Sequence, residues 1–427
     1  MAKKRKIASR KPGVSHPRDR SSKSKKLDNP KEELFLEPVL PSIKEQVLAL
    51  KRAPLPRPLK VSSTHRPDWV SPLKRLEEQF EKSLSRPKVS VVIVNHNGVD
   101  FLWHCLFALK TQTYPPVEIL LVDNASTDAS LSFVRTNYPQ VKILECQENF
   151  GFALGSNLGA KTAIGDLVAL LNNDVVVTPD WLARMVQDFR DHGPGLGAMS
   201  SAVKLTGSTE KRWLEPHETL NILGNLVRGY FEDSQEVFYP EGCSLLYARY
   251  LANDGPFDPD YFLYQEDVYL GWKLRLLDRR VRRSPGAKVF HQGGGTMSIF
   301  PEWKKVYYGT RNRWLNLFLF YETGNLIKVM PWMAGESLLR LIQSLGKGFH
   351  FFFGNCLAIA WFLTHPSSVL LKRLEIQEKR RVPDSEILKF VSGRVTLDGG
   401  AISRLLNFLS LAYCGLVGLP ILESQED

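Results

Sequence analysis

The stretch Leu167–Asp174, Leu-Val-Ala-Leu-Leu-Asn-Asn-Asp, is an apolar run that ends in three polar side chains. Such a run predicts a buried strand of a parallel sheet, because these strands are apolar on both faces. Ligands of open α/β sheets bind beyond the carboxyl ends of the strands. In an extended chain Asn172 and Asp174 point the same way, and their oxygens suit a hard divalent cation. A plain polar turn is the alternative, and these residues alone support it equally.

Strands and helices alternate around this stretch. Four apolar runs predict strands, at residues 89–94, 117–122, 141–144 and 167–171. Helical patterns predict a helix capped by Asp100, one through Phe133, one over 152–163, and one that starts at 178–180. This order predicts an α/β fold with a mostly parallel sheet, helices on its faces and right-handed crossovers.

Charge is concentrated at the start of the chain of 427 residues, which is long enough for one large domain or two smaller ones. The net charge is +11, and residues 1–26, with eleven Lys and Arg and one acid, supply +10 of it. The remaining +1 gives no sign of nucleic-acid binding, so we expect no nucleic-acid partner. Residues 1–33 should be a disordered basic tail, either solvated or attracted to an anionic surface. Residues 34–87 are Pro-rich and predict a linker with short helices.

Cysteine usage and the N-terminus predict the compartment. The five cysteines are widely spaced and include no Cys-x-x-Cys pair, so neither a disulfide framework nor a zinc site is indicated. Cys105 and Cys146 fall in apolar elements, where a reduced thiol is expected. The N-terminus has no apolar segment typical of a secretory signal. We therefore expect a cytoplasmic protein.

The loops after the predicted strands are polar rather than glycine-rich. The first strand is not followed by Gly-x-Gly-x-x-Gly, and no Gly-x-x-x-x-Gly-Lys-Ser/Thr motif occurs, which argues against a dinucleotide dehydrogenase and a P-loop enzyme. Asn, Asp and Ser side chains in these loops suit a pyrimidine base and a ribose. Asp123 is the best single candidate for that contact, and a turn or capping role is its rival.

Several motifs together resemble a known family. They are Val91–Gly98, Val122–Asp128, Asn149–Gly159, Gly165–Asp174, Asp254–Val268 and Val289–Gly294. In this order they resemble family 2 glycosyltransferases of the GT-A fold, and most of all the rhamnosyltransferase-like and galactofuranosyltransferase-like bacterial members. The resemblance covers roughly residues 88–320. It implies transfer of a sugar from a dTDP- or UDP-sugar to a glycan or lipid-linked acceptor in cell-wall or polysaccharide biosynthesis.

The resemblance also implies roles for particular residues. Asp267 would be the general base with Glu266 beside it, and Asp174 and His291 would bind Mg²⁺ or Mn²⁺. The nucleotide sugar would be bound by Asn95, Asn97, Asp123, Asn124, Asn149, Gly151, Asn157, Asn172 and Asn173.

Two departures from the family pattern bear on these roles. An acidic-x-acidic motif is usual where this chain has Asn172-Asn173-Asp174, so one carboxylate remains and metal binding should be weaker. Tyr269 stands where a second acid often follows the base.

The glycines at 293–295 suit either a mobile loop or a simple turn, and Arg311 and Arg313 suit phosphate less well than a solvated or interfacial role.

The chemistry follows from what glycosyl transfer requires. A divalent cation neutralises the leaving diphosphate, and a carboxylate takes the proton of the acceptor hydroxyl. One carboxylate and no covalent intermediate imply inversion at the anomeric carbon. The rivals are an inactive nucleotide-sugar-binding module, which Asn172 motivates, and a sugar nucleotidylyltransferase, which would need a glycine-rich, Arg-containing loop after the first strand.

Composition changes at residue 314, so we expect a GT-A domain over 88–313 and a helical region over 314–427. Phe349–Leu363 and Leu405–Leu422 are apolar, but the first is too short to span a membrane and the second contains Asn407, Gly415, Gly418 and Pro420. Amphipathic helices at a membrane interface and a helical subdomain packed on the core are equally supported. Lipid-linked acceptors would place the protein at the inner face of the membrane.

Overall fold

The computed structural model describes residues 70–206, 218–228, 235–253, 255–293, 300–396 and 400–422. The basic tail and the part of the linker before residue 70 lie outside these ranges, and so do residues 294 and 295 of the glycine run. The first described helix is α2, Val70–Ser83.

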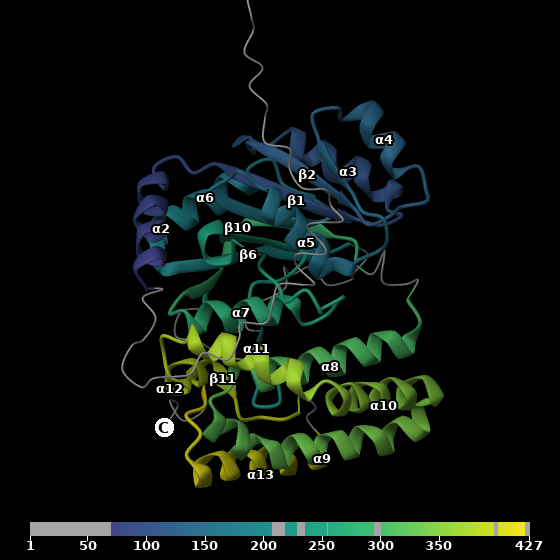
Figure 1. Cartoon of the computed structure of the whole chain (residues 1–427), viewed down its shortest axis with the longest axis vertical. Coiled ribbons are helices and arrows are strands. Elements are labelled where there is room, and N and C mark those ends of the chain that lie inside the picture. The colour runs from purple at the N-terminus through teal and green to yellow at the C-terminus, as the bar shows by residue number, and fades with distance from the viewer. Residues whose placement is uncertain are drawn as a thin grey trace, which may run out of the picture. The chain divides into compact units, whose positions relative to one another are not determined.

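A mixed sheet forms the upper part of the described structure in Figure 1, above the helices α8 to α13. Its strands lie in the order β3 (Lys142–Glu145), β2 (Glu118–Asp123), β1 (Val89–Asn95), β4 (Leu167–Asn172), β9 (Ser244–Ala248), β6 (Leu196–Leu205), β10 (Arg280–His291) and β5 (Val175–Val177). The strands β3, β2, β1 and β4 run parallel, as do β6 and β10, whereas β9 and β5 are antiparallel to their neighbours. The predicted mostly parallel α/β sheet is confirmed. The antiparallel β9 was not predicted.

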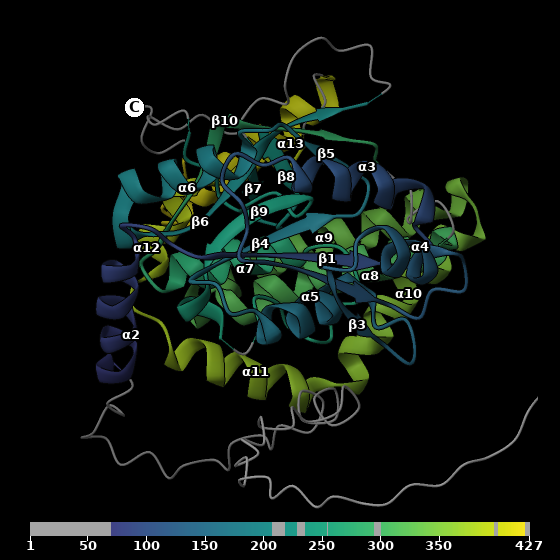
Figure 2. The same ribbon diagram turned by 90° about the horizontal axis from the view of Figure 1, so that it is seen from above.

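Helices cover both faces of this sheet. Figure 2 shows α3 (Val99–Lys110) and α6 (Trp181–His192) on the opposite side of the strands from α5 (Gly151–Thr162). The helix through Phe133 is α4, Ser130–Asn137. A Cβ at Gly159 would lie 2.3 Å from Cγ1 of Val92, so glycine lets α5 approach β1 closely.

Two predicted helix starts were wrong in detail. Asp100 lies inside the first turn of α3 and does not cap it; the carboxylate of Asp128, from the loop after β2, accepts the Val99 N–H instead (3.1 Å). The helix at 178–180 begins later, at Trp181, because the Thr178 carbonyl accepts the Trp181 N–H in a preceding turn (3.0 Å). In the first case a carboxylate distant in sequence accepts the free N–H at the helix start. In the second case a local turn accepts it.

The second half of the described chain is mainly helical. Its helices are α7 (Glu266–Leu276), α8 (Glu302–Phe320), α9 (Thr323–Lys347), α10 (Phe349–Thr364), α11 (Pro366–Glu378), α12 (Asp384–Ile387) and α13 (Ala401–Val417). A small sheet joins β11 (Val391–Ser392), β7 (Glu218–Asn221) and β8 (Leu226–Arg228). The helix α8 runs without a break through residue 314, where the composition changes.

The helices divide into buried and exposed faces. The ring of Phe320 on α8 stacks on Trp272 of α7 with centroids 5.8 Å apart, and both rings are buried. The outer sides of α9 and α13 instead carry exposed large apolar side chains, such as Leu345 and Leu416. Within the described ranges, no helix combines the length and the hydrophobicity needed to cross a bilayer.

Candidate functional site

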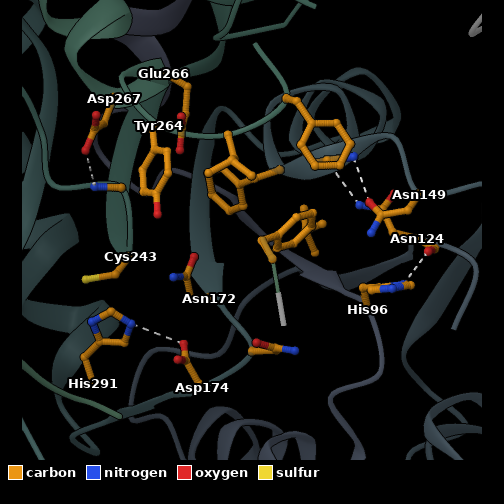
Figure 3. Close-up of a pocket in the computed structure, with 18 of the residues that line it drawn as sticks. His96, Asn124, Asn149, Asn172, Asp174, Cys243, Tyr264, Glu266, Asp267 and His291 are labelled. Atoms are coloured by element: carbon orange, nitrogen blue, oxygen red, sulfur yellow. Dashed lines mark hydrogen bonds and ion pairs between the residues drawn. The ribbon is translucent and has the colours of Figure 1, made fainter. Parts of the chain in front are cut away.

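A pocket of about 340 Å³ lies at the carboxyl ends of β1 and β4, where the parallel sheet predicts a ligand site (Figure 3). Nine of the residues proposed from the sequence line it: Asn124, Asn149, Gly151, Asn172, Asn173, Asp174, Glu266, Asp267 and His291. Its walls come from strand ends, from the turn before α7 and from the end of β10. The topology therefore gathers segments that are far apart in the sequence.

One wall pairs a carboxylate with an imidazole. Oδ1 of Asp174 lies 3.3 Å from Nε2 of His291, and both side chains are largely buried. Asp174 sits in the turn between β4 and β5, and β5 pairs antiparallel with the end of β10, so that His291 lies opposite Val175. The Gln292 N–H donates to the Asp174 carbonyl (3.0 Å), which ties the two ends together. Backbone pairing thus holds these two potential metal ligands side by side.

The opposite wall carries the two adjacent acids at the start of α7. Oδ2 of Asp267 accepts the Gly242 N–H (3.3 Å), and its Oδ1 accepts the Val268 N–H (2.8 Å). Burial and, second, the neighbouring Asp267 raise the pKa of Glu266 to about 8. Oε2 of Glu266 is buried and has no hydrogen-bond partner among the described residues. Burial and the neighbouring carboxylate thus favour the protonated form of Glu266.

A strained turn places these acids. Tyr264 and Gln265, which directly precede α7, both have positive φ, 69° and 66°. Each such residue costs about 1–3 kcal/mol, and strain of this kind persists where the surroundings enforce it. The Asn312 amide on α8 donates to the carbonyls of Leu263 (2.9 Å) and Tyr264 (2.8 Å), and the Asn316 amide donates to that of Gln265 (3.2 Å). Helix α8 therefore holds the turn in place.

A third wall is formed by asparagines. The amide of Asn124 donates to the Gly151 carbonyl (2.9 Å), while its buried Oδ1 has no partner among the described residues. The Gly151 N–H donates to Oδ1 of Asn149 (2.9 Å), and the Asn124 carbonyl contacts Nδ1 of His96 (2.7 Å). Gly151 has φ +78°, and a Cβ there would lie 2.2 Å from the Phe262 carbonyl oxygen. The glycine is needed for that close approach.

Four residues of the predicted nucleotide-binding set do not line this pocket. Asn95 donates to Oδ1 of Asp123 (3.2 Å) and accepts from the Asn173 amide (2.7 Å). Asp123 also accepts the Ser126 N–H (2.9 Å) and is almost fully buried. Asn97 accepts the Thr127 N–H (2.7 Å) in the neighbouring loop. These side chains brace the loops after β1, β2 and β4.

Asn157 is the fourth of these residues. Its amide donates to the Phe257 carbonyl (2.8 Å), and its Oδ1 accepts the Phe257 N–H (3.1 Å). Gly255 leaves the space that the Asn157 side chain fills, because a Cβ there would lie 2.4 Å from its Cγ. Asn157 thus anchors the segment that leads into the strained turn, and acts on the pocket from outside it.

Other lining residues were not proposed from the sequence. They are Val94, Phe152, Glu241, Gly242, Cys243, Phe262, Leu263, Tyr264 and Phe300, with His96 among the loop residues. The Cys243 thiol is held protonated because burial, then Glu241 and Asp174, raise its pKa well above the usual value. The Glu-Gly-Cys run at 241–243 directly precedes the unpredicted strand β9, so recognising that strand would have found it.

Three further residues considered in the sequence analysis lie near this pocket. Arg311 and Arg313 are buried, so a solvated role is wrong: Arg311 donates to the Asp260 carbonyl (2.6 Å), and Arg313 to that of Leu223 (2.6 Å). Tyr269 packs in an aromatic cluster, with its ring 5.1 Å from that of Phe320. The burial of Arg311 and Arg313 could not be predicted from the sequence, because arginine side chains are usually exposed.

Comparison with protein families identifies the segment that supplies one part of this pocket. Residues 90–255 match the model of glycosyl transferase family 2. Residues 90–255 therefore form a glycosyl transferase family 2 domain. The uncharacterized glycosyltransferase YwdF of Bacillus subtilis is 27% identical over 48% of this chain and 74% of its own length. Glycosyltransferase AglE of Haloferax volcanii is 33% identical over 45% of this chain and 62% of its own.

A further relative of this family 2 glycosyltransferase is the N-acetylglucosaminyl-diphospho-decaprenol L-rhamnosyltransferase of Mycobacterium tuberculosis, 25% identical over 47% of this chain and 75% of its own. Among solved structures, the mannosyltransferase PcManGT of Pyrobaculum calidifontis in complex with GDP-Man and Mn²⁺ matches 83% of this chain and 96% of its own, with 16% identity and a TM-score of 0.42. The resemblance to family 2 glycosyltransferases of the GT-A fold is confirmed.

Proposed function

We propose that the pocket transfers a glycosyl unit from a nucleotide-diphosphate sugar to an acceptor hydroxyl, with inversion at the anomeric carbon. The observation that carries this proposal is the meeting of the Asp174–His291 pair and the Glu266–Asp267 pair in one pocket. The first pair suits a diphosphate-bound cation, and the second suits proton removal from an acceptor. Asn124 and Asn149 lie beside them with hydrogen-bonding groups for the nucleoside.

The charges of the pocket support a metal requirement. Its described lining residues include Asp174, Glu241, Glu266 and Asp267, but no Lys or Arg. A diphosphate entering this acidic pocket would therefore need a cation. Asp174 and His291 would hold Mg²⁺ or Mn²⁺, which would neutralise charge on the leaving diphosphate. No cluster of three or more His, Cys, Asp or Glu able to hold a metal occurs among the described residues, so diphosphate oxygens and water would complete the ligand set.

Asp267 is the proposed base. Its side chain lies in the first turn of α7 and lines the pocket (Figure 3). Glu266, whose pKa is raised to about 8, would stay neutral beside it. A proton leaving the acceptor hydroxyl would pass to Asp267 as the hydroxyl oxygen attacks the anomeric carbon and the bond to the diphosphate breaks.

A thermal-shift screen tests the donor assignment. UDP, dTDP, GDP and UDP- and dTDP-sugars would be added with Mg²⁺, with Mn²⁺ or with chelator. A nucleotide that binds the folded state at 100 times its Kd should stabilise it by about 2.7 kcal/mol, and only with metal. Slow hydrolysis of the matching nucleotide sugar should follow. If no nucleotide diphosphate stabilises the protein under any condition, the proposal is wrong.

Two finer assignments remain proposals. The polar loops after the strands favour a dTDP- or UDP-linked sugar as donor, and the name of the rhamnosyltransferase relative favours a lipid-linked glycan as acceptor. The alternative is a catalytically inactive nucleotide-sugar-binding module, which the single carboxylate of Asn172-Asn173-Asp174 favours. Donor binding without hydrolysis or transfer at any Mn²⁺ concentration would favour the module.

We also propose that α9 and α13 dock on an anionic membrane surface. The two helices are neighbours, because the Tyr413 hydroxyl donates to the Lys328 carbonyl (2.8 Å). Their exposed apolar side chains include Ile327, Leu338, Ile342, Leu345, Ile402, Leu405, Phe408 and Leu416. Their charged side chains include Lys328, Arg340 and Arg404 and the acid Glu336, which is largely buried against Arg313. An apolar surface with basic charge suits anionic lipids.

A further inference from the structure

A second pocket, of about 370 Å³, lies between α8, α9 and α10. Three cations line it: Lys305 and Arg313 from α8 and Arg340 from α9. No Asp or Glu is among its described lining residues, and amide and hydroxyl groups of Gln343, Ser344 and Asn355 complete its polar surface. This pocket differs in charge from the acidic first pocket.

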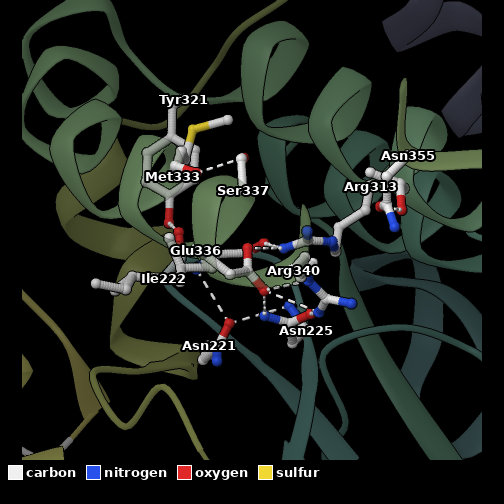
Figure 4. A network of polar contacts seen from close by, with 12 residues as sticks. Asn221, Ile222, Asn225, Arg313, Tyr321, Met333, Glu336, Ser337, Arg340 and Asn355 are labelled. Carbon is white, nitrogen blue, oxygen red and sulfur yellow. Dashed lines mark hydrogen bonds and ion pairs between the residues drawn. The ribbon is translucent and has the colours of Figure 1, made fainter. Parts of the chain in front are cut away.

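The arginines are fixed in place by one acid behind them. Oε2 of Glu336 pairs with Nη1 of Arg313 (2.7 Å), and its Oε1 pairs with Nη2 of Arg340 (2.8 Å) (Figure 4). Arg340 also donates to Oδ1 of Asn225 (2.9 Å). Glu336 offsets one of the two arginine charges, and Lys305 pairs at the surface with Glu302 (2.7 Å), a weak interaction in water. The pocket therefore keeps a net positive charge.

Arg313 has hydrogen-bonding capacity left over. Its side chain is 5% exposed, and its buried Nη2 has no hydrogen-bond partner among the described residues. Oε1 of Gln265, which lines the same pocket, is also buried without a partner. A buried donor without a partner costs free energy, so a ligand that accepts a hydrogen bond from Arg313 would remove that cost. Guanidinium groups favour phosphate oxygens.

The second pocket meets the first at one turn. Tyr264 and Glu266 line the first pocket, and Gln265, between them in the chain, lines the second. A ligand seated against Gln265 thus contacts the strained residue that places the proposed base. The exposed side chain of Phe349, at the start of α10, and Phe351, which lines the pocket, add apolar surface nearby.

We propose that the second pocket binds the phosphate or diphosphate group of the acceptor, while the acceptor hydroxyl reaches Asp267 in the first pocket. This inference rests on the proposed glycosyl transfer. The phosphate would lie against Arg313, Arg340 and Lys305. The shared chemistry is a phosphate monoester or diphosphate, carried either by a lipid or by a soluble glycan.

The test measures binding at the second pocket with the first one filled. The full chain is saturated with UDP and Mn²⁺, and farnesyl diphosphate, inorganic diphosphate and farnesol are titrated by calorimetry. We expect farnesyl diphosphate to bind, with an affinity that falls as salt rises. The double variant Lys305→Gln/Arg340→Gln should weaken it on the order of 100-fold, tenfold for each charged contact. Lys304→Gln, a neighbouring cation that does not line the pocket, should change little.

The outcomes separate the possibilities. Equal binding of inorganic diphosphate would assign the site to phosphate alone, and binding of farnesyl diphosphate alone would assign it to a lipid carrier. Equal binding of farnesol, or unchanged affinity in the double variant, would overturn the phosphate pocket. UDP affinity is measured in the wild-type protein and in every variant. A wild-type protein that does not bind UDP would contradict the proposed donor site and not this inference.

Discussion

The side-chain amide of Asn312 donates to the carbonyl oxygen of Tyr264 over 2.8 Å, and so links α8 to the turn that presents Glu266 and Asp267. Asn312 is fully buried and also receives the Arg311 Nε–H on its Oδ1 (2.8 Å). Asn312 does not line the first pocket itself, yet it fixes the backbone next to the proposed base. Its effect should be on the geometry of the acids and not on donor binding.

Replacing Asn312 by alanine should therefore lower transfer more than donor affinity. The change removes two hydrogen bonds from a strained turn and leaves buried carbonyls unpaired, at about 1–3 kcal/mol each. We expect transfer at saturating donor to fall at least tenfold while the Kd for the nucleotide changes little. Stability is followed by urea unfolding. Asn137→Ala is the control, since that exposed amide bonds within its own helix, to the Phe133 carbonyl. A fall in donor affinity alone would contradict the positioning role.

The metal pair gives a second prediction. Asp174→Ala and His291→Ala should each raise the Mn²⁺ concentration needed for half-maximal activity, and Asp174→Ala more so, because it removes the one carboxylate of the Asn-Asn-Asp turn. Asn172→Asp should lower that concentration, since it adds a carboxylate to the same wall of the pocket. The measurement is initial rate against free Mn²⁺. A wild-type rate that survives chelator would contradict the metal assignment.

The positions of the strand ends were predictable from the sequence, but the contacts that each polar side chain makes there were not. An apolar run followed by polar residues predicts Asn172 and Asp174 at a sheet edge, and both line the pocket. Asn95 and Asp123 have the same pattern, yet they bond to each other behind it. The alternation of side chains along a strand predicts which face of the sheet a residue lies on. It does not predict which polar side chain will form a hydrogen bond with a neighbouring loop.

The supports from α8 were beyond sequence reasoning for a different reason. Asn312 lies in a helix that the composition change at residue 314 assigned partly to another region. Its partners, the carbonyls of Leu263 and Tyr264, are backbone groups that leave no mark on the sequence. Long-range contacts of this kind are visible only in three dimensions.

The membrane surface gives a third prediction, for the full chain and for vesicles that contain phosphatidylglycerol. Phe408→Ser/Leu416→Ser removes two exposed apolar side chains from α13. Each is worth about 1.5–3 kcal/mol when buried, so vesicle binding should weaken on the order of 10²–10⁴-fold. Ile164→Ser, at another exposed apolar residue outside α9 and α13, should have no effect. Flotation assays measure both. Binding that ignores lipid charge and survives the double variant would contradict the proposal.

The acidic pair gives the sharpest prediction, because its two members should fail in different ways. Asp267→Asn keeps the shape of the side chain but cannot take a proton, so transfer should drop on the order of 10²–10⁴-fold with donor affinity nearly unchanged. Glu266→Gln should cost less, because Glu266 is already neutral below about pH 8. Calorimetry of donor binding and rate measurement are made for both variants. An active Asp267→Asn beside an inactive Glu266→Gln would reverse the roles.

The pH dependence of this pair separates the two roles further. In the wild-type protein, Glu266 should ionise as pH rises through about 8, which adds negative charge beside the diphosphate, so the donor KM should rise above that pH. The pKa of Glu266 is raised from its usual value of 4.5, so the stability that it contributes is fully present below about pH 4.5 and is lost as pH rises through 8. Glu266→Gln should therefore flatten the donor KM profile and be more stable than wild type at pH 9. If instead the wild-type rate climbs with an apparent pKa near 8 and Glu266→Gln abolishes it, Glu266 is the base and Asp267 its partner.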